Sequence, residues 1–150
     1  MTLAVAVAAD GVRIPVSRAR VRGIALNVLR AEGVREALVS LAFVTTRAIA
    51  HLNRRHLGHP GSTDVIAFGF TAPGKAKPKL LVGDIYIAPV VARRNARAFG
   101  VGVREEIARL IVHGVLHVIG HDHPAGQKRG ESPMWRRQEA LLRRLERSSP

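Results

Sequence analysis

The sequence predicts an α+β fold in which about five helices pack on a small mixed sheet of about four strands. Apolar runs of strand length alternate with segments whose apolar residues recur at helical spacing. The chain has 150 residues, 47% of them hydrophobic, which is enough for one core of ordinary size. No internal repeat and no linker-like composition divides it. We therefore expect one domain over residues 1–150.

The first half of the chain predicts a strand, a helix, a strand and a helix, in that order. Uninterrupted apolar runs indicate buried strands, and an apolar stripe opposite a row of arginines indicates a helix. The expected elements are a strand over Leu3 to Ala8, a helix from Pro15 that ends at Gly33, a strand over Ala37 to Thr45, and a helix that Thr45 or Thr46 caps and that continues towards Arg55. Two strands separated by a helix favour a parallel pair with a right-handed crossover.

The second half predicts two more strands followed by three helices. The expected elements are a strand over Thr63 to Phe70, a basic loop over Thr71 to Lys79, a strand over Leu80 to Ala88 antiparallel to the previous one, a helix from Pro89 to Gly100 or Gly102, a helix with Glu105 and Glu106 in its first turn, and a last helix that Ser132 caps and Pro133 opens. Glu106 precedes His113 by two turns, so we interpret it as a terminal charge and not as a metal ligand.

Histidines concentrate in the segment HGVLHVIGHDH, which begins at His113 and holds four of the seven histidines of the chain. His113 and His117 are four residues apart, so a helix places both imidazoles on one face. Gly120 allows a turn that returns His123 to the same point. Three protein ligands leave one position of a tetrahedral Zn²⁺ open, which is typical of a catalytic site. We predict one Zn²⁺ per chain, held by His113, His117 and His123.

The remaining polar residues of this segment have supporting roles in this prediction. His121 and Asp122 are expected around the ligands and not on the metal, with Asp122 bonded to a ligand imidazole. No catalytic side chain is assigned, because the nucleophile is either a water that the metal activates or, for a substrate that carries its own 2′-OH, that hydroxyl. The alternative for the whole segment is that its histidines are satisfied polar groups on a half-buried helix.

The charge of the chain predicts a polyanionic partner. Its net charge is +13, and 20 of its 24 basic residues are arginine. RNA is the favoured partner, without DNA specificity, and the few aromatic residues make backbone contacts more important than base stacking. The candidate RNA-binding residues are Arg54, Arg55, His56, Arg93, Arg94 and Arg97. The alternative is that the arginines are solvated and reflect genome composition.

Other features of the composition favour a cytoplasmic protein. The chain contains no cysteine, which fits a reducing compartment. The apolar start MTLAVAVAA lacks the basic region of a signal peptide, and no apolar run approaches about 18 residues. We expect no membrane partner.

The spacing HxxxHxxGxxH is shared with metzincin proteases, in which a glutamate follows the first histidine and acts as general base. Here that residue is Gly114. The full string instead resembles the HGxLHLxGxDH signature of the YbeY family of bacterial endoribonucleases and rRNA maturation factors. The segment LNRRHLGHPGSTDVIAF from Leu52 is similar to that family's LN…TDVLSF segment, and LVGDIYIA from Leu81 is similar to its LGDI strand. The resemblance covers about residues 40 to 125.

This resemblance implies a small mixed sheet with a zincin-like metal helix, a zinc ion on His113, His117 and His123, and cleavage of single-stranded RNA. It also implies a role in maturation of the 3′ end of small-subunit rRNA and in ribosome quality control, with the small ribosomal subunit as partner. Two departures stand out. Leu57 replaces an arginine that helps to hold phosphate in the family, and Ala67 replaces the serine of the LSF triplet.

Three functions follow as hypotheses. The first is a zinc-dependent endoribonuclease that acts on RNA. The second is a ribosome-assembly factor that binds RNA and keeps its metal for structure. The third is a metallopeptidase-like hydrolase, which the missing glutamate at Gly114 disfavours.

Overall fold

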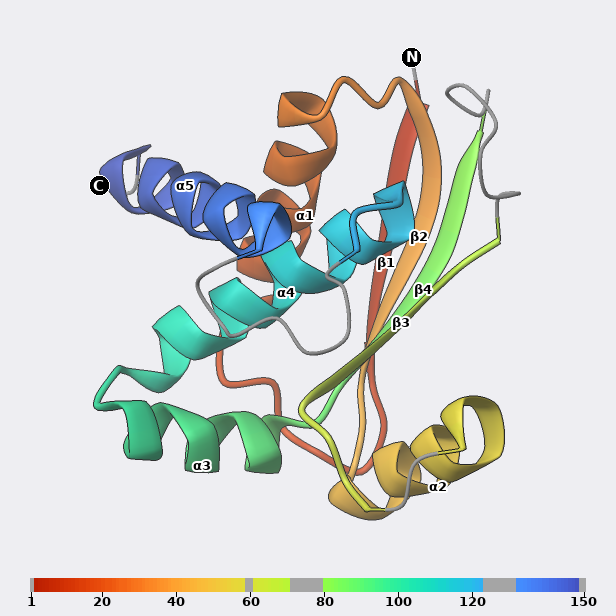
Figure 1. Cartoon of the computed structure of the whole chain (residues 1–150), viewed down its shortest axis with the longest axis vertical. Coiled ribbons are helices and arrows are strands. Elements are labelled where there is room, and N and C mark those ends of the chain that lie inside the picture. The colour runs from red at the N-terminus through yellow and green to blue at the C-terminus, as the bar shows by residue number, and fades with distance from the viewer. Residues whose placement is uncertain (1, 59–60, 71–79, 123–131, 149–150) are drawn as a thin grey trace.

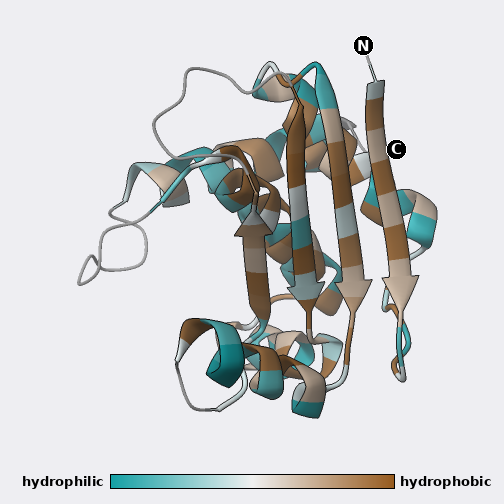
Figure 2. Ribbon diagram, turned by 90° about the vertical axis from the view of Figure 1, so that its right-hand side faces the viewer, coloured by the Kyte–Doolittle hydropathy of each residue, from teal (hydrophilic) through white to brown (hydrophobic). Residues whose placement is uncertain are grey.

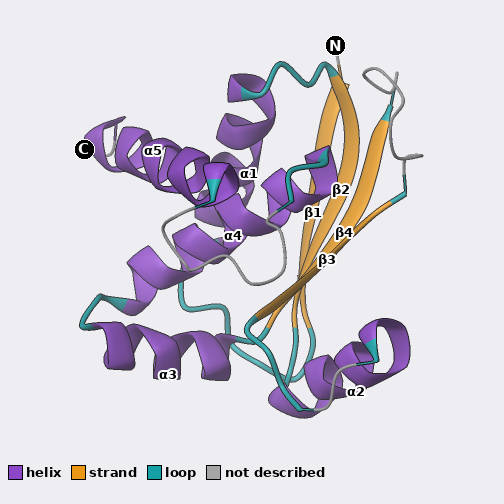
Figure 3. Ribbon diagram, in the orientation of Figure 1, coloured by secondary structure: helices purple, strands orange, loops and turns teal. Residues whose placement is uncertain are grey.

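A computed structural model describes residues 2–58, 61–70, 80–122 and 132–148, and these residues form one mixed four-stranded sheet and five helices (Figures 1 and 3). The elements are β1 (Thr2–Ala9), α1 (Arg18–Ala31), β2 (Glu36–Phe43), α2 (Thr46–Leu57), β3 (Val65–Gly69), β4 (Leu81–Ile87), α3 (Pro89–Phe99), α4 (Val103–Ile119) and α5 (Pro133–Ser148). The predicted α+β class and the predicted number of strands and helices are confirmed for this part of the chain.

The sheet has the strand order β1-β2-β4-β3. β1 and β2 are parallel, as are β2 and β4, whereas β3 is antiparallel to β4. The predicted parallel pair at the start and the predicted antiparallel pair in the middle are therefore both correct. Between β1 and β2 the helix α1 returns the chain to the same edge, whereas between β2 and β4 the antiparallel strand β3, which follows α2, makes the return.

The helices cover the two faces of the sheet unequally. α1, α4 and α5 lie on one side, with α3 next to α4, whereas α2 lies across the carboxyl ends of the parallel strands on the other side (Figure 1). Figure 2 looks onto that second face, where the strands stand in front of the other helices. A small second core joins α2 to the sheet through Val44, Ile49, Ile66, Ala88 and Val91. No described helix has both the length and the apolar character that a membrane span requires.

α4 is the central helix, because it packs on α1, α3, α5, β3 and β4. Two glycines allow it to lie close to the sheet. A Cβ at Gly114 would be 2.7 Å from Ile85 Cγ2, and a Cβ at Gly83 would clash with the side chain of Val118. Since α4 carries His113 and His117, this close packing gives the histidine pair a rigid support.

The helix ends show where the sequence predictions were right and where they were wrong. The helix expected from Pro15 begins at Arg18, because Ser17 is its N-cap and accepts a hydrogen bond from the Arg20 N–H. It ends at Ala31 with Glu32 as its C-cap, and Gly33 follows in the left-handed conformation with a φ of 75°, so Gly33 marks the end of the helix as predicted. Thr45 caps α2, Pro89 opens α3 and Ser132 caps α5, all as predicted. The expected basic loop over Thr71 to Lys79 lies outside the described residues.

Candidate metal and RNA-binding site

The histidine pair lies on the third and fourth turns of α4. The ring centroids of His113 and His117 are 4.6 Å apart, with an angle of 72° between the ring planes. Both side chains are partly buried, whereas Gly114, Val115 and Leu116 between them are buried. The i, i+4 spacing thus brings two imidazoles together at the edge of the core, as the sequence predicted.

The third predicted ligand, His123, lies outside the described residues. Within the described ranges, no group of three His, Cys, Asp or Glu side chains is arranged to hold a metal ion. The chemistry of the pair nevertheless suits Zn²⁺, because neutral imidazole is one of its preferred ligands and two imidazoles on one helix face can reach one ion. His113 and His117 are thus two compatible ligands.

A polar side chain that the sequence analysis missed lies against His113. Gln138 of α5 is 1% exposed, and its Oε1 is 2.7 Å from His113 Nδ1. Its Nε2 donates to Glu139 Oε2 at 3.1 Å. No local pattern marks Gln138 in the sequence, since it belongs to the site only through the packing of α5 on α4.

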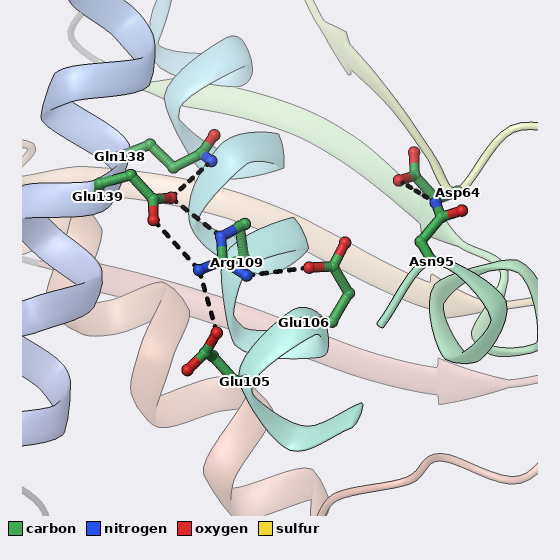
Figure 4. Close-up of polar contacts among 7 residues, drawn as sticks. All are labelled: Asp64, Asn95, Glu105, Glu106, Arg109, Gln138 and Glu139. Carbon is green, nitrogen blue, oxygen red and sulfur yellow. Dashed lines mark hydrogen bonds and ion pairs between the residues drawn. The ribbon is translucent and has the colours of Figure 1, made fainter. Parts of the chain in front are cut away.

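Arg109 links α4 to α5 beside this glutamine (Figure 4). It donates to both carboxylate oxygens of Glu139, to Glu106 at 3.0 Å and to Glu105 at 3.2 Å. Burial lowers the pKa of Arg109, but hydrogen bonds with Glu139, Glu106 and Glu105 raise it by more, so its pKa lies above the ordinary value. The guanidinium is therefore a permanent positive charge between three carboxylates.

Glu106 lies in the first turn of α4, as the sequence predicted, but it is also 1% exposed and forms an ion pair with Arg109. Its exclusion from the metal ligands, which rests on its distance along the helix, stays a prediction. Its burial depends on the helices that surround α4, which the local pattern of charges does not report.

A second ion cluster holds the chain just after α4. Glu32, the C-cap of α1, accepts a hydrogen bond from His121 Nε2 through Oε1 and from Arg137 of α5 through Oε2 at 2.8 Å. The His121 side chain thus points to Glu32 and ties the residues just after α4 to the end of α1. Asp122 is exposed, and its expected bond to a ligand imidazole stays a prediction.

The candidate RNA-binding residues lie on two neighbouring helices. Arg54, Arg55 and His56 occupy the exposed last turn of α2, and Arg93, Arg94 and Arg97 are exposed on α3. α2 and α3 contact each other at the same end of the sheet. His56 also packs on the Phe68 ring in a T-shaped arrangement, with centroids 5.5 Å apart. The two helices that carry the candidate RNA-binding residues therefore lie at the same end of the sheet (Figure 1).

Two polar residues hold the segment between α2 and β3. Asn53 is buried at the end of α2, and its Nδ2 donates to the Gly61 carbonyl at 3.0 Å. Asp64 accepts a hydrogen bond at 3.1 Å from Asn95 of α3 (Figure 4). Leu57 ends α2 and is 46% exposed, so the position at which the sequence departs from the resembled pattern faces solvent.

The fold and the site together define a small, strongly basic α+β protein whose central helix presents a histidine pair. Residues 11–146 match the family described as Endoribonuclease YbeY. The chain therefore belongs to the YbeY family, whose members are nuclease hydrolases by name. The resemblance stated from the histidine signature is confirmed.

Individual relatives agree with this membership. The chain is 39% identical over 125 residues to Endoribonuclease YbeY of Pelotomaculum thermopropionicum, with 81% of each chain covered. It is 41% identical over 120 residues to Endoribonuclease YbeY of Moorella thermoacetica, with 75% of this chain and 76% of the relative covered. A solution structure of a Thermotoga maritima protein has a TM-score of 0.61 at 21% identity, over 97% of this chain and 93% of the other. At that identity the structural match shows the fold alone.

Proposed function

We propose that this chain is a zinc-dependent endoribonuclease that cleaves single-stranded RNA. The observation that carries the proposal is the pairing of His113 and His117 on the buried central helix, within a fold that the YbeY endoribonucleases share. His123 completes the proposed ligand set. The substrate proposed is small-subunit rRNA near its 3′ end, on the small ribosomal subunit in the cytoplasm, with a role in ribosome quality control.

The residues of the chain would divide the work between holding the cofactor and holding the substrate. His113, His117 and His123 would hold one zinc ion, which supplies Lewis-acid catalysis at a phosphodiester when bound. Arg54 and Arg55 would neutralise phosphates of the strand, and Arg93, Arg94 and Arg97 on the neighbouring helix would extend that track. The attacking oxygen is either that of water or the 2′-OH of the substrate.

A peptidase function is disfavoured by the packing of α4. A metzincin carries its general base directly after the first histidine, where this chain has Gly114. Position 114 faces Ile85 and leaves no room for a longer side chain. The structure thus adds a steric reason to the chemical one, since a glutamate at this position would point into the core and away from a bound metal.

The test combines metal content with cleavage of two kinds of substrate. We expect one equivalent of zinc in the purified protein, loss of that zinc in His117→Ala, and slow cutting of single-stranded RNA that a chelator stops and His123→Ala abolishes. His51→Ala, which changes an exposed histidine of α2, is the matched control and should behave as wild type. Full zinc occupancy in the His113→Ala/His117→Ala double variant would refute the metal site. Degradation of casein with RNA left intact would refute the RNA chemistry.

A further inference from the structure

A continuous line of hydrogen bonds runs from Arg109 to the candidate ligand His113. Arg109 donates to Glu139 through Nε at 3.0 Å and through a terminal nitrogen at 3.1 Å. Glu139 accepts from Gln138 Nε2 at 3.1 Å, and Gln138 Oε1 lies 2.7 Å from His113 Nδ1. Figure 4 shows the first part of this line, with the amide nitrogen of Gln138 turned towards Glu139.

The direction of each bond follows from the charge at the Arg109 end. A guanidinium only donates, and an ionised carboxylate only accepts. Glu139 is therefore an acceptor for Arg109 and for Gln138, which must turn its NH₂ group towards it. The reversed amide would place two acceptor oxygens against each other in a region where Gln138 is only 1% exposed, and burial makes such an unmatched contact costly.

The orientation of Gln138 in turn decides which nitrogen of His113 carries the ring proton. The amide oxygen can only accept, so Nδ1 must be the donor across the 2.7 Å contact. In a neutral imidazole only one nitrogen is protonated, and Nε2 is then left with a lone pair. A lone pair is what a metal ion requires of a histidine ligand.

We propose that Gln138 is a positioning residue which, oriented by Glu139 and Arg109, holds His113 in the tautomer that keeps its proton on Nδ1 and offers Nε2 to a metal ion. The binding of a metal ion by His113 Nε2 rests on the proposed function, whereas the tautomer of His113 does not. Because Arg109 and His113 belong to α4 and Gln138 and Glu139 to α5, the docking of these two helices sets the position of the proton.

The experiment measures the tautomer and metal binding separately. Nitrogen-15 NMR of the histidine rings, recorded on metal-free protein at a pH where the rings are neutral, distinguishes a protonated Nδ1 from a protonated Nε2. We expect wild-type His113 to be protonated on Nδ1. In Gln138→Met, which has similar length and no acceptor oxygen, the proton should redistribute over both nitrogens. Zinc affinity, measured by competition with a chelator, should fall by about 10- to 100-fold in this variant.

Two further variants keep the test decisive. Glu139→Gln removes the ionised acceptor and frees the amide of Gln138 to reverse. It should therefore also mix the two tautomers of His113. If Gln138→Met does not fold, Glu139→Gln serves as the test variant in its place. Glu146→Gln makes the same change at an exposed position of α5 and should leave both readouts at the wild-type values.

The outcomes separate this inference from the proposed function. Metal-free wild type with its proton on Nε2 would overturn the inference, as would a Gln138→Met spectrum identical to that of wild type. A proton on Nδ1 in wild type that redistributes in both variants supports it. If that result appears in a protein that binds no zinc, the inference stands and the proposed metal site falls.

Discussion

Gly114 lies directly against Ile85, so that a Cβ at position 114 would be 2.7 Å from Ile85 Cγ2. This contact brings the helix with the histidine pair onto β4. It also separates this site from that of a metzincin, because the position of the proteolytic glutamate is occupied by the packing of helix on sheet.

Gly114→Ala should destabilise the protein relative to the same change at Gly23. Gly23 lies inside α1 with nothing within 4 Å of an added Cβ, so Gly23→Ala should stabilise by about 0.5 to 1 kcal/mol through helix propensity. Gly114→Ala gains the same propensity but overpacks Ile85, which costs about 1 to 3 kcal/mol. Urea unfolding of both variants measures the difference. Equal stabilities would show that α4 can move away from the sheet at no cost.

Arg109→Met should be among the most destabilising single changes in α4. It leaves the carboxylate of Glu106, 2% exposed, without its guanidinium, and loss of one partner of a buried ion pair costs about 3 to 5 kcal/mol. Glu105→Gln removes the 36% exposed partner of the same arginine and should cost at most about 1 kcal/mol. Thermal and urea unfolding give both values. A small effect of Arg109→Met would mean that water replaces the guanidinium.

Leu57→Arg should raise the rate at which single-stranded RNA is cut. Leu57 is 46% exposed at the end of α2, so an arginine fits there and can donate to a phosphate. One such bond, worth about 1.4 kcal/mol in the transition state, corresponds to about a tenfold increase in kcat/KM. The control is Leu80→Arg. It adds the same charge directly before β4, where Leu80 is 42% exposed.

The outcome at Leu57 also discriminates between the proposed nuclease and a ribosome-assembly factor. If the wild-type protein binds rRNA but cuts nothing, and Leu57→Arg cuts RNA, the chain is an assembly factor with a disabled site. An increase equal to that of Leu80→Arg would show that added charge acts without regard to position.

RNA binding should depend strongly on salt. If about five phosphates of a single strand are neutralised, log K should fall with log salt at a slope of about −3.5. Arg55→Ala, on the exposed end of α2, should reduce the magnitude of the slope by about 0.7. Arg35→Ala removes an exposed charge before the amino end of β2, at the opposite end of the sheet from α2, and should leave the slope unchanged. Fluorescence anisotropy of a labelled oligonucleotide in a salt series measures it, and a flat response would argue against an RNA partner.

The histidine pair and the helix caps were predictable because they depend on local geometry. A spacing of four residues brings His113 and His117 together in any α-helix, and a threonine or serine before a helix accepts a hydrogen bond from the next turn wherever that helix lies. The basic residues of α2 and α3 were predictable as a set, but their common place at one end of the sheet was not. The start of α1 was misplaced because Pro15 suits the first position of a helix and Ser17 suits the N-cap before it, and the structure uses Ser17.

By itself, the sequence determined the order of strands and helices, the antiparallel β3–β4 pair, the two imidazoles on one face and the family to which the chain belongs. Only the tertiary structure decided that Gln138 supports His113 across 25 residues of sequence and that Arg137 binds Glu32 across 105. The physical reason is that periodicity and capping follow from neighbours along the chain. The partner of a buried polar group depends instead on which helices dock together and at what register.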